Sequence, residues 1–481
     1  MSAFGKGWTS FMGKRDGFGG KPDRRVLILG GGFGGVYTAL GLEKQLKAED
    51  RTEVTLVNAE NFFLFTPLLA EVASSSIDTS HAINPIRRMF KRTRFVEGEV
   101  VGLDPDKRTV TVRHPGDTEY DYPYDQLVVA LGARQGYFGM KDVQEHSLTV
   151  KTLGDAIHLR NWAIQMLETA DVERDPGRRA ELLTFVVAGG NLTGVEVCGE
   201  LNDLVRQAAQ SYPTISQRDI RVILIEAANR LVPALDENLS RFTLQRLRAA
   251  GVEVMLTSSV NGAGEREVRI KGQEPIPTRT LVWATGVAPN PFLQGSPLPK
   301  DEKGWLTVDA HLRVPGLPGV WALGDCARVP DVLKPGKFQT SAAQQAIREG
   351  HHLARNIVTY LRGGAPTEFR YRSMGQMATL GRFNGVGLIG PVPVSGFIAW
   401  AIWRTYYLYR LPRLEKQLRV VVDWTADLVF GRDISQIQTY VSNVAGDEHQ
   451  HDIGARHPQS SQGPDAVGAG SSGGADSKWE D

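Results

Sequence analysis

The sequence predicts an α/β fold with two Rossmann-like dinucleotide-binding domains, followed by a C-terminal membrane-associating module. A strand, a glycine-rich turn and a helix follow one another from Arg24, in RRVLILGGGFGGVYTALGL, and again from Thr184, in TFVVAGGNLTGVEVCGEL. Each unit has a later strand that ends in small residues, VVALGA at 128–133 and LVWATG at 281–286. Because the whole unit is repeated, we expect two dinucleotides to bind side by side.

The composition excludes several classes of protein. A chain of 481 residues has room for roughly two to four domains, and its 41% hydrophobic and 23% charged residues are ordinary globular usage. A formal net charge of +1 gives no support to a nucleic-acid partner. Two cysteines cannot build a disulfide scaffold, and we predict no metal site.

The first glycine turn, GGGFGG, fits the pattern G-x-G-x-x-G between a buried strand and a helix. Gly30 permits the tight turn, Gly32 lets the backbone approach a pyrophosphate, and Gly35 lets the helix pack on the strand. The helix N-terminus then offers unpaired N–H groups to the phosphates. The predicted nucleotide-binding residues here are Gly30, Gly32, Phe33, Gly34 and Gly35.

The next strand, VTLVNAE, ends where an acidic residue is expected to bind a ribose. It ends in Asn58, and Glu60 follows two residues later. An amide oxygen accepts a hydrogen bond from a ribose hydroxyl, but without the charge assistance of a carboxylate. Either residue can serve, so the sequence leaves this contact open.

The second glycine turn differs from the first at its middle position. The turn is formed by Gly189, Gly190, Asn191 and Gly194, and Asn191 stands where the middle glycine is normally wanted. A side chain at that position crowds a pyrophosphate unless the turn shifts. The following strand, RVILIEA, ends in Glu226, which can accept from both ribose hydroxyls and would repel a 2′-phosphate. The carboxylate of Glu226 at the end of this strand therefore favours NADH over NADPH.

In this order, the motifs resemble those of the type II NADH dehydrogenases (NADH:quinone oxidoreductases), glutathione-reductase-like flavoproteins with two dinucleotide-binding domains. The resemblance covers roughly residues 24–440. It rests on VLILGGGFGG, NFFLFTPLLAEVA (61–73), GVEVCGEL (194–201), TLVWATGVAPN (280–290), GVWALGDCA (319–327) and AAQQAIREG (342–350). The resemblance implies FAD in the first turn, NADH in the second and a quinone as acceptor.

The resemblance also implies individual roles. Asp325 matches an acid that hydrogen-bonds the FAD ribityl chain, although a helix N-cap would equally explain it. Glu196 matches a glutamate near the stacked nicotinamide and flavin, although it would also suit the dipole of its helix. The other implied cofactor-binding residues are Thr66, Pro67, Leu68, Ala130, Gly132, Thr285, Gly286, Gly324 and Ala343, with Phe65 beside them.

The stretch from Ala343 to Arg348 resembles the family's quinone-site motif A-Q-x-x-x-Q. Gln344 keeps the first glutamine, whose amide can donate to a quinone carbonyl. Arg348 replaces the second glutamine, four residues on and therefore on the same helix face. The guanidinium could stabilise a developing quinolate or a more anionic acceptor, or the quinone pocket could be altered. Glu196, Gln344 and Arg348 are the predicted catalytic residues.

The C-terminal region mixes aromatic and basic residues at helical spacing. Residues 383–403 carry no charge, but their glycines and prolines argue against an unbroken membrane-spanning helix. The pattern that follows suits a helix in the headgroup layer of an anionic membrane, or one packed on the body or at a dimer interface. Its residues are Phe397, Trp400, Trp403, Arg404, Tyr406, Tyr407, Tyr409, Arg410, Arg413, Lys416 and Arg419.

These observations lead to one functional prediction and its rivals. We expect a peripheral membrane enzyme at the cytoplasmic face of the cell membrane that passes hydride from NADH to FAD and two electrons to a quinone, without pumping protons. Rivals are a diaphorase with another acceptor and a slow-turnover flavin-binding redox sensor. Disulfide and sulfide:quinone reductases are disfavoured because Cys198 and Cys326 lie far apart. The sequence leaves open whether the chain forms a homodimer.

The predicted organisation has six parts. They are a flexible leader (1–21), the first part of the FAD-binding domain (22–150), the NADH-binding domain (151–299), the second part of the FAD-binding domain (300–365), a C-terminal module with an amphipathic membrane-surface helix (366–444) and a disordered tail (445–481).

Overall fold

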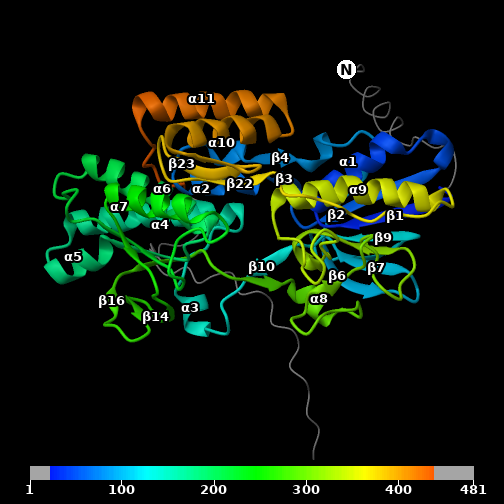
Figure 1. The fold of residues 1–481 in the computed structure, drawn as a ribbon, viewed down its shortest axis with the longest axis horizontal. Helices are drawn as coiled ribbons and strands as arrows, with labels where there is room; N and C mark the ends of the chain where they lie inside the picture. The colour runs from blue at the N-terminus through cyan, green and yellow to red at the C-terminus, as the bar shows by residue number, and fades with distance from the viewer. Residues whose placement is uncertain (1–21, 438–481) are drawn as a thin grey trace, which may run out of the picture. The chain divides into compact units, whose positions relative to one another are not determined.

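The structure is a computed structural model that describes residues 22–437. The predicted leader (1–21) and tail (445–481) lie outside the described residues. Within them, two parallel sheets carry the two glycine turns, and a smaller antiparallel sheet carries the last two helices (Figure 1).

The first sheet has the strand order β20-β9-β1-β2-β5 and is parallel throughout. Its central strand β1 is flanked by β2 and β9, so that its apolar residues are buried on both faces, as the run VLIL requires. The strands are β1 (Arg24–Leu29), β2 (Thr52–Asn58), β5 (Arg94–Glu97), β9 (Gln126–Val129) and β20 (Val320–Ala322).

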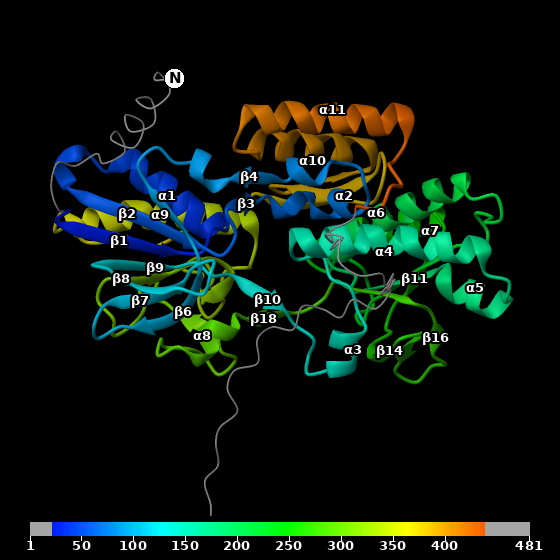
Figure 2. The same cartoon turned by 180° about the vertical axis from the view of Figure 1, so that it is seen from behind.

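Helices cover one face of this sheet and a three-stranded antiparallel sheet covers the other (Figures 1 and 2). The helices are α1 (Phe33–Gln45) and α9 (Ala343–Leu361), and the small sheet is β6 (Glu99–Asp104), β7 (Thr109–Arg113) and β8 (Glu119–Pro123). Both β20 and α9 follow the second sheet in sequence, so the chain returns to the first sheet after completing the second. Shorter elements here are β3 (Phe62–Leu64), α2 (Leu69–Ala73), β4 (Ile83–Pro85), α8 (Pro291–Gly295), β19 (Leu306–Thr307) and β21 (Ala327–Arg328).

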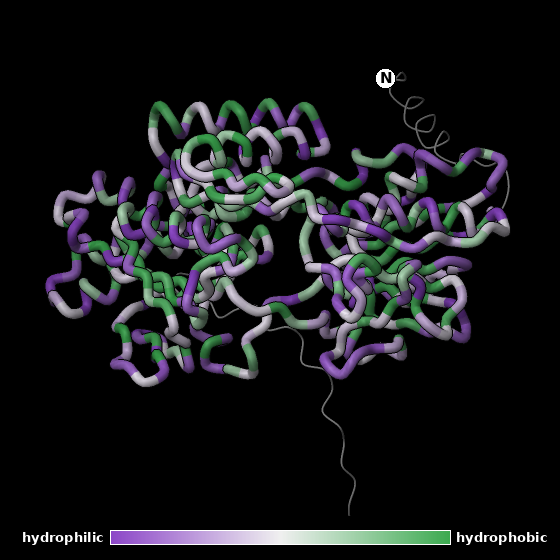
Figure 3. Tube along the Cα trace, in the orientation of Figure 1, coloured by the Kyte–Doolittle hydropathy of each residue, from purple (hydrophilic) through white to green (hydrophobic). Residues whose placement is uncertain are grey.

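The second sheet repeats the arrangement with the strand order β13-β12-β11-β17, again parallel. Its strands are β11 (Thr184–Ala188), β12 (Arg221–Ile225), β13 (Val252–Met255) and β17 (Thr280–Trp283). They are hydrophobic along most of their length, like the strands of the first sheet (Figure 3). The accompanying elements are α3 (Lys141–Glu145), α4 (Leu153–Val172), α5 (Pro176–Leu182), α6 (Leu192–Ala208), α7 (Glu237–Ala249), β14 (Val260–Gly264), β15 (Glu267–Ile270) and β16 (Ile276–Pro277). Two antiparallel strands, β10 (Ala133–Gln135) and β18 (Val287–Pro289), link the two halves.

The C-terminal module differs from the single aromatic-basic helix that the sequence predicts. Strands β22 (Gly375–Thr379), β23 (Gly385–Ile389) and β24 (Val392–Ser395) support α10 (Gly396–Arg410), and α11 (Leu414–Phe430) lies outside α10 (Figures 1 and 2). Two helices form because Pro412 lacks a backbone N–H and restricts Leu411, so α10 ends there. Among residues 22–437, no helix is long and apolar enough to cross a membrane.

Candidate active site

A cavity of about 800 Å³ lies where the two glycine turns meet α10. This volume falls within the range of small-molecule sites, and its position at the carboxyl ends of parallel strands is where α/β sheets bind ligands. Residues from both turns, from the segment after β3, from the start of α9 and from α10 form its walls.

The first turn is built to admit a phosphate. Gly30 has a φ of +106°, and a Cβ there would lie 2.3 Å from the carbonyl oxygen of Ala130. A Cβ on Gly35 would lie 1.9 Å from the carbonyl oxygen of Gly30, so both positions require glycine. A Cβ on Gly32 would meet nothing within 4 Å, and no side chain caps the N-terminus of α1. The turn therefore presents open space and free N–H groups, as a bound pyrophosphate requires.

Asn58 supports this turn from behind. Its Oδ1 accepts a hydrogen bond from the backbone N–H of Gly31 at 2.7 Å, and its Nδ2 donates to the carbonyl oxygen of Glu60 at 2.8 Å. Neither Asn58 nor Glu60 is among the residues that line the cavity. The structure thus gives Asn58 a structural role and leaves its predicted ribose contact a prediction.

The second turn has the same backbone as the first, although an asparagine replaces the middle glycine. Asn191 has φ −74° and ψ −179°, against −80° and −169° for Gly32. Its Oδ1 accepts from the N–H of Gly194 at 2.9 Å, and its Nδ2 donates to the carbonyl oxygen of Ala284 at 2.8 Å. The side chain therefore caps α6 without shifting the turn, and it occupies the N–H of Gly194. The corresponding N–H at the start of α1 has no such cap among the described residues and is free.

Glu226 stabilises the second turn by the same kind of side-chain-to-backbone hydrogen bond that Asn58 makes in the first. Its Oε2 accepts from the backbone N–H of Gly190, and its Oε1 accepts from the N–H of Ala228 at 2.7 Å. The two strand ends thus repeat the same contact in both domains. The preference for NADH over NADPH that the sequence suggests at Glu226 remains a prediction.

Replacing Asn191 by glycine is expected to tighten NADH binding about 3- to 10-fold. The N–H of Gly194 becomes available to the pyrophosphate, and one hydrogen bond contributes roughly 0.5–1.5 kcal/mol. The loss of the cap should reduce stability by only a few tenths of a kcal/mol, since glycine is itself tolerated at an N-cap. The measurement is the NADH dependence of flavin bleaching in a stopped-flow spectrometer; unchanged or weaker binding would show that the cap does not limit the site.

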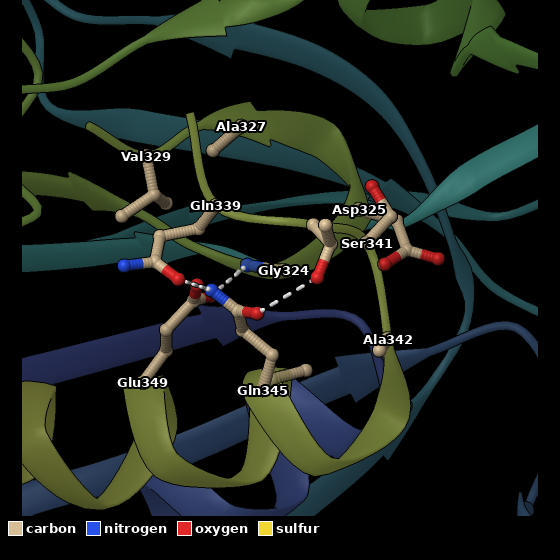
Figure 4. A pocket seen from close by; sticks show the side chains of 11 residues that line it. Gly324, Asp325, Ala327, Val329, Gln339, Ser341, Ala342, Gln345 and Glu349 are labelled. Carbon is tan, nitrogen blue, oxygen red and sulfur yellow. Dashed lines mark hydrogen bonds between the residues drawn. The ribbon is translucent and has the colours of Figure 1, made fainter. Parts of the chain in front are cut away.

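Asp325 faces the cavity from the 3₁₀ turn η6 (Gly324–Cys326). It is half-buried, and no hydrogen bond to its carboxylate is found in the part of the chain that the structure describes. Figure 4 shows it turned away from Glu349, which instead accepts from the N–H of Gly324 at 2.7 Å. Burial raises the pKa of Asp325, and Lys151 opposes this shift. An unsatisfied acceptor at the cavity wall fits a hydroxyl-bearing ligand chain.

The segment after β3 brings most of its predicted residues to the cavity. Phe65, Thr66 and Pro67 line it, together with Leu69 and Ala70. Leu68 does not, because it is fully buried in the hydrophobic core. Of the other predicted residues, those that line the cavity are Gly32, Phe33, Gly34, Ala130, Gly132, Asn191, Gly286, Gly324 and Ala343. Those that do not are Gly30, Gly35, Gly189, Gly190, Gly194, Glu226 and Thr285, most of which shape the turns behind it.

Glu196 lies on α6 at the cavity wall, half-buried beneath α10. Its Oε1 accepts from Trp403 Nε1 at 3.1 Å and from the backbone N–H of Thr379 at 3.3 Å. Burial raises the pKa of Glu196 to about 8, although both hydrogen bonds lower it. The carboxyl group is thus protonated at neutral pH and can deliver a proton into the cavity.

The two residues predicted to bind the quinone, Gln344 and Arg348, differ in position: only Gln344 lines the cavity. Gln344 lines the cavity, and its Nε2 donates to the carbonyl oxygen of Gly375 at 2.8 Å. Arg348 is exposed outside the cavity lining, where it contacts Met374 and its guanidinium carbon lies 4.8 Å from the ring centroid of Tyr371. Arg410, at the end of α10, is the arginine that lines the cavity. The sequence analysis placed Arg410 in the aromatic-basic pattern that suits either a membrane surface or a helix packed on the body or at a dimer interface.

The two cysteines take no part in this chemistry. Cys198 and Cys326 are free and buried, and burial raises the pKa of each thiol to about 12. A thiol that stays protonated is a poor nucleophile, so neither residue can act as a reactive thiolate. This agrees with the sequence-based argument against a disulfide reductase.

Comparison with known proteins identifies the chain. A family model described as pyridine nucleotide-disulphide oxidoreductase matches residues 24–350. A type II NADH:quinone oxidoreductase of Mycobacterium tuberculosis is 34% identical, over 86% of this chain and 90% of its own length. A probable NADH dehydrogenase of Dictyostelium discoideum is 31% identical, over 86% and 91% respectively. Among solved structures, NDH2 from Plasmodium falciparum in complex with NADH has a TM-score of 0.79 at 21% identity, over 86% of this chain and 99% of that one.

The fold and the two nucleotide turns define an oxidoreductase with two dinucleotide-binding domains, and the chain belongs to the pyridine nucleotide-disulphide oxidoreductase family. Within it, the chain belongs to the type II NADH:quinone oxidoreductases. The predicted α/β fold with two Rossmann-like domains and the resemblance on which it rested are both confirmed.

Proposed function

We propose that this chain is an FAD-dependent oxidoreductase that takes hydride from NADH and passes two electrons to a quinone without pumping protons. The observation that carries the proposal is a single cavity bounded by two phosphate-binding turns, one open at Gly32 and one capped at Asn191. The family membership supports the same activity and the same two cofactors, FAD and NADH.

Bound FAD would supply the redox chemistry, accepting hydride on one side and releasing electrons on the other. The chain's own residues would position it. The turn at Gly32 and the free N-terminus of α1 would hold the pyrophosphate, and Asp325 would accept from ribityl hydroxyls. The turn at Asn191 and the start of α6 would hold NADH, and Glu196 would provide a proton beside the reacting rings.

The acceptor would enter between α9, β23 and α10. This part of the cavity combines apolar side chains with two polar donors, Gln344 and Arg410. The apolar residues are Ile347, Met377, Leu388, Ile389, Ile402, Tyr406 and Tyr407. Such a lining suits a ring with an apolar tail and two carbonyl oxygens, which an amide and a guanidinium can both hydrogen-bond.

The activity is tested by NADH oxidation with the purified yellow protein, in the presence and absence of a short-chain quinone. We expect rapid oxidation only when quinone is present. Oxidation that requires a different soluble acceptor would favour a diaphorase. Bound flavin that NADH does not bleach would favour a redox sensor and overturn the proposal.

We further propose that α11 and the start of α10 attach the protein peripherally to the cytoplasmic face of the cell membrane. The buried side of α11 holds Val420 and Trp424, whereas its outer side carries an exposed apolar stripe. The stripe consists of Leu414, Leu418, Val421, Val422, Val429 and Phe430, and Phe397 and Ile398 are exposed at the start of α10. Exposed Arg419 beside it suits an anionic headgroup layer. A homodimer interface would cover the same face.

Placing aspartate at both Leu418 and Val422 should release the protein from anionic vesicles. Burial of each apolar side chain contributes roughly 1.5–3 kcal/mol, so losing both should lower the partition coefficient at least about a hundredfold. Vesicle co-sedimentation measures it, and Val172→Asp, on a similarly exposed valine at the end of α4, is the matched control. A change in oligomeric state without a change in vesicle binding would assign the face to a dimer.

A further inference from the structure

Three carboxyl groups lie along one face of α6, starting at the cavity. Glu196, Glu200 and Asp203 are spaced four and three residues apart, which places them on the same side of the helix. At about 1.5 Å per residue, the row extends for roughly 10 Å. Its inner end is Glu196 at the cavity wall, and its outer end is Asp203, whose side chain is 22% exposed.

Two more carboxyl groups face this row from other elements. Glu71, on α2, accepts from Arg404 of α10 at 3.4 Å and from Trp424 Nε1 of α11 at 3.1 Å. Asp427, on α11, lies 3.8 Å from Arg432 Nε. Glu71 and Asp427 are both less than 5% exposed. The cluster therefore reaches from the cavity to the underside of the C-terminal helices.

Three arginines enter the same cluster. Arg432 pairs with Glu200 at 2.7 Å and lies 3.7 Å from Asp203, whose Oδ2 also accepts from the backbone N–H of Arg382 at 2.7 Å. Arg404 is stacked between Trp400 and Trp424, with ring centroids 4.3 and 4.6 Å from its guanidinium carbon.

The cluster holds more carboxyl groups than guanidinium groups. Five carboxyls share the cluster with three arginines, and arginine does not lose its proton in proteins. Neutrality therefore requires protons on the carboxyls. Burial raises the pKa of Glu71, and that of Asp203 and Asp427. The pKa of Glu71 is lowered by Arg404 and Arg432 and raised by Glu200. The pKa of Asp427 is likewise raised by Glu200, and it is lowered by the arginines Arg432, Arg382 and Arg404.

Several buried polar atoms of this cluster have no hydrogen-bond partner among the described residues. They are both carboxylate oxygens of Asp427 and the Nε atoms of Arg382, Arg404 and Arg432. Buried polar groups normally find a protein or water partner, and unsatisfied groups gathered in one place indicate ordered water. Water between ionisable groups that share protons is a medium for proton transfer.

We propose that the carboxyl row of α6, with Glu71, Asp427 and buried water, conducts protons from solvent at Asp203 to Glu196. The inference rests on the proposed function. Reduction of a quinone by NADH consumes one proton, NADH + H⁺ + quinone → NAD⁺ + quinol. Hydride supplies one hydrogen of the quinol, and the second comes from solvent. Glu196 gives its proton to the acceptor oxygen and regains one from Glu71 through the buried water. Asp203 then exchanges a proton with bulk water and restores the protons of the cluster.

The route is tested with Asp203→Asn and Asp427→Asn in the intact protein. Each change keeps the shape of the side chain and removes its ability to exchange a proton. We expect reoxidation of the reduced enzyme by a short-chain quinone to slow about tenfold at pH 8, with a larger solvent deuterium isotope effect, while bleaching by NADH is unchanged. Imidazole, a diffusible acid, should restore the rate. Asp423→Asn, one helical turn from Asp427 and paired with His81, is the matched control.

A second readout does not depend on turnover. Infrared titration of the wild-type protein should show a protonated-carboxyl band at pH 7 that disappears by pH 9 and is reduced in Glu71→Gln. Normal reoxidation in both asparagine variants, or equal slowing of both half-reactions, would overturn the route. A wild-type protein that NADH bleaches but quinone does not reoxidise would instead contradict the proposed function, while the infrared band would still report on the cluster.

Discussion

Gly32→Asp should produce a folded protein that binds no flavin. A Cβ at Gly32 meets no protein atom within 4 Å, and the backbone φ of −80° suits any residue, so the new side chain enters only the cavity. Aspartate is also a favoured N-cap, which should preserve α1. Its carboxylate would point toward the pyrophosphate that this turn is proposed to hold, and two like charges about 4 Å apart repel by roughly 4 kcal/mol at an effective dielectric constant of 20. Flavin affinity should therefore fall about a thousandfold.

The measurement is the flavin-to-protein absorbance ratio after purification, with circular dichroism to establish folding. Gly32→Ala is the steric control, because it adds only the Cβ and no charge. Asn191→Asp is the control for position, since the same charge in the second turn should leave flavin bound and weaken NADH instead. Full flavin content in Gly32→Asp would mean that the first turn does not hold the pyrophosphate.

The parts of the site that were predicted from sequence are those encoded by neighbouring residues. Both turns follow buried strands directly, and the need for glycine at Gly35 comes from the carbonyl oxygen of Gly30 in the same turn. The close contact of Gly30 with Ala130, 100 positions away, is not encoded locally, but the glycine pattern still marks the position. At Asn191 the turn does not shift, because the amide folds back on Gly194 and Ala284; the predicted crowding of a pyrophosphate there stays a prediction. A side-chain rotamer that satisfies the backbone of its own turn is not visible in a spacing pattern.

The parts that were missed join residues far apart in the chain. Trp403 contacts Glu196 across 207 positions, and Glu71 meets Trp424 across 353. The aromatic-basic pattern of α10 suggested a helix in the headgroup layer, yet Trp400, Trp403 and Arg404 face inward. The sequence did contain one usable signal, the spacing of Glu196, Glu200 and Asp203, because an apolar helix face would not carry three acids unless they were paired or shared protons.

The structure places Arg348, at the position of the second glutamine of the quinone motif, outside the cavity lining, and its predicted role stays a prediction. Positions 344 and 348 share a helix face, but Ile347 is the last residue of α9 in the cavity lining, and Arg348 instead contacts Tyr371 and Met374. Arg410 reaches the cavity from the opposite wall. An anionic acceptor is therefore no better supported by Arg348 than a quinone.

Glu196→Gln should slow quinone-dependent reoxidation about a hundredfold at pH 7 and leave flavin reduction by NADH unchanged. A positioned general acid contributes roughly 10²–10⁴-fold, and the amide keeps an oxygen that can accept from Trp403 and Thr379. Because the pKa of Glu196 is raised to about 8, the wild-type carboxyl is protonated below pH 8 and ionised above it. Wild-type reoxidation should therefore be level up to about pH 8 and fall at higher pH, whereas the variant should be slow and show no such step.

Stopped-flow traces between pH 6 and pH 10 measure both half-reactions separately. Trp403→Phe provides the control, because it removes a hydrogen bond that lowers the pKa of Glu196 and keeps the ring in place. The pH step should then move above 8 while the rate at pH 7 stays near that of the wild type. If the fall in reoxidation rate occurs at the same pH in the wild type, Glu196→Gln and Trp403→Phe, it belongs to another titratable group. Glu196 would then be only a buried side chain that links α6 to α10.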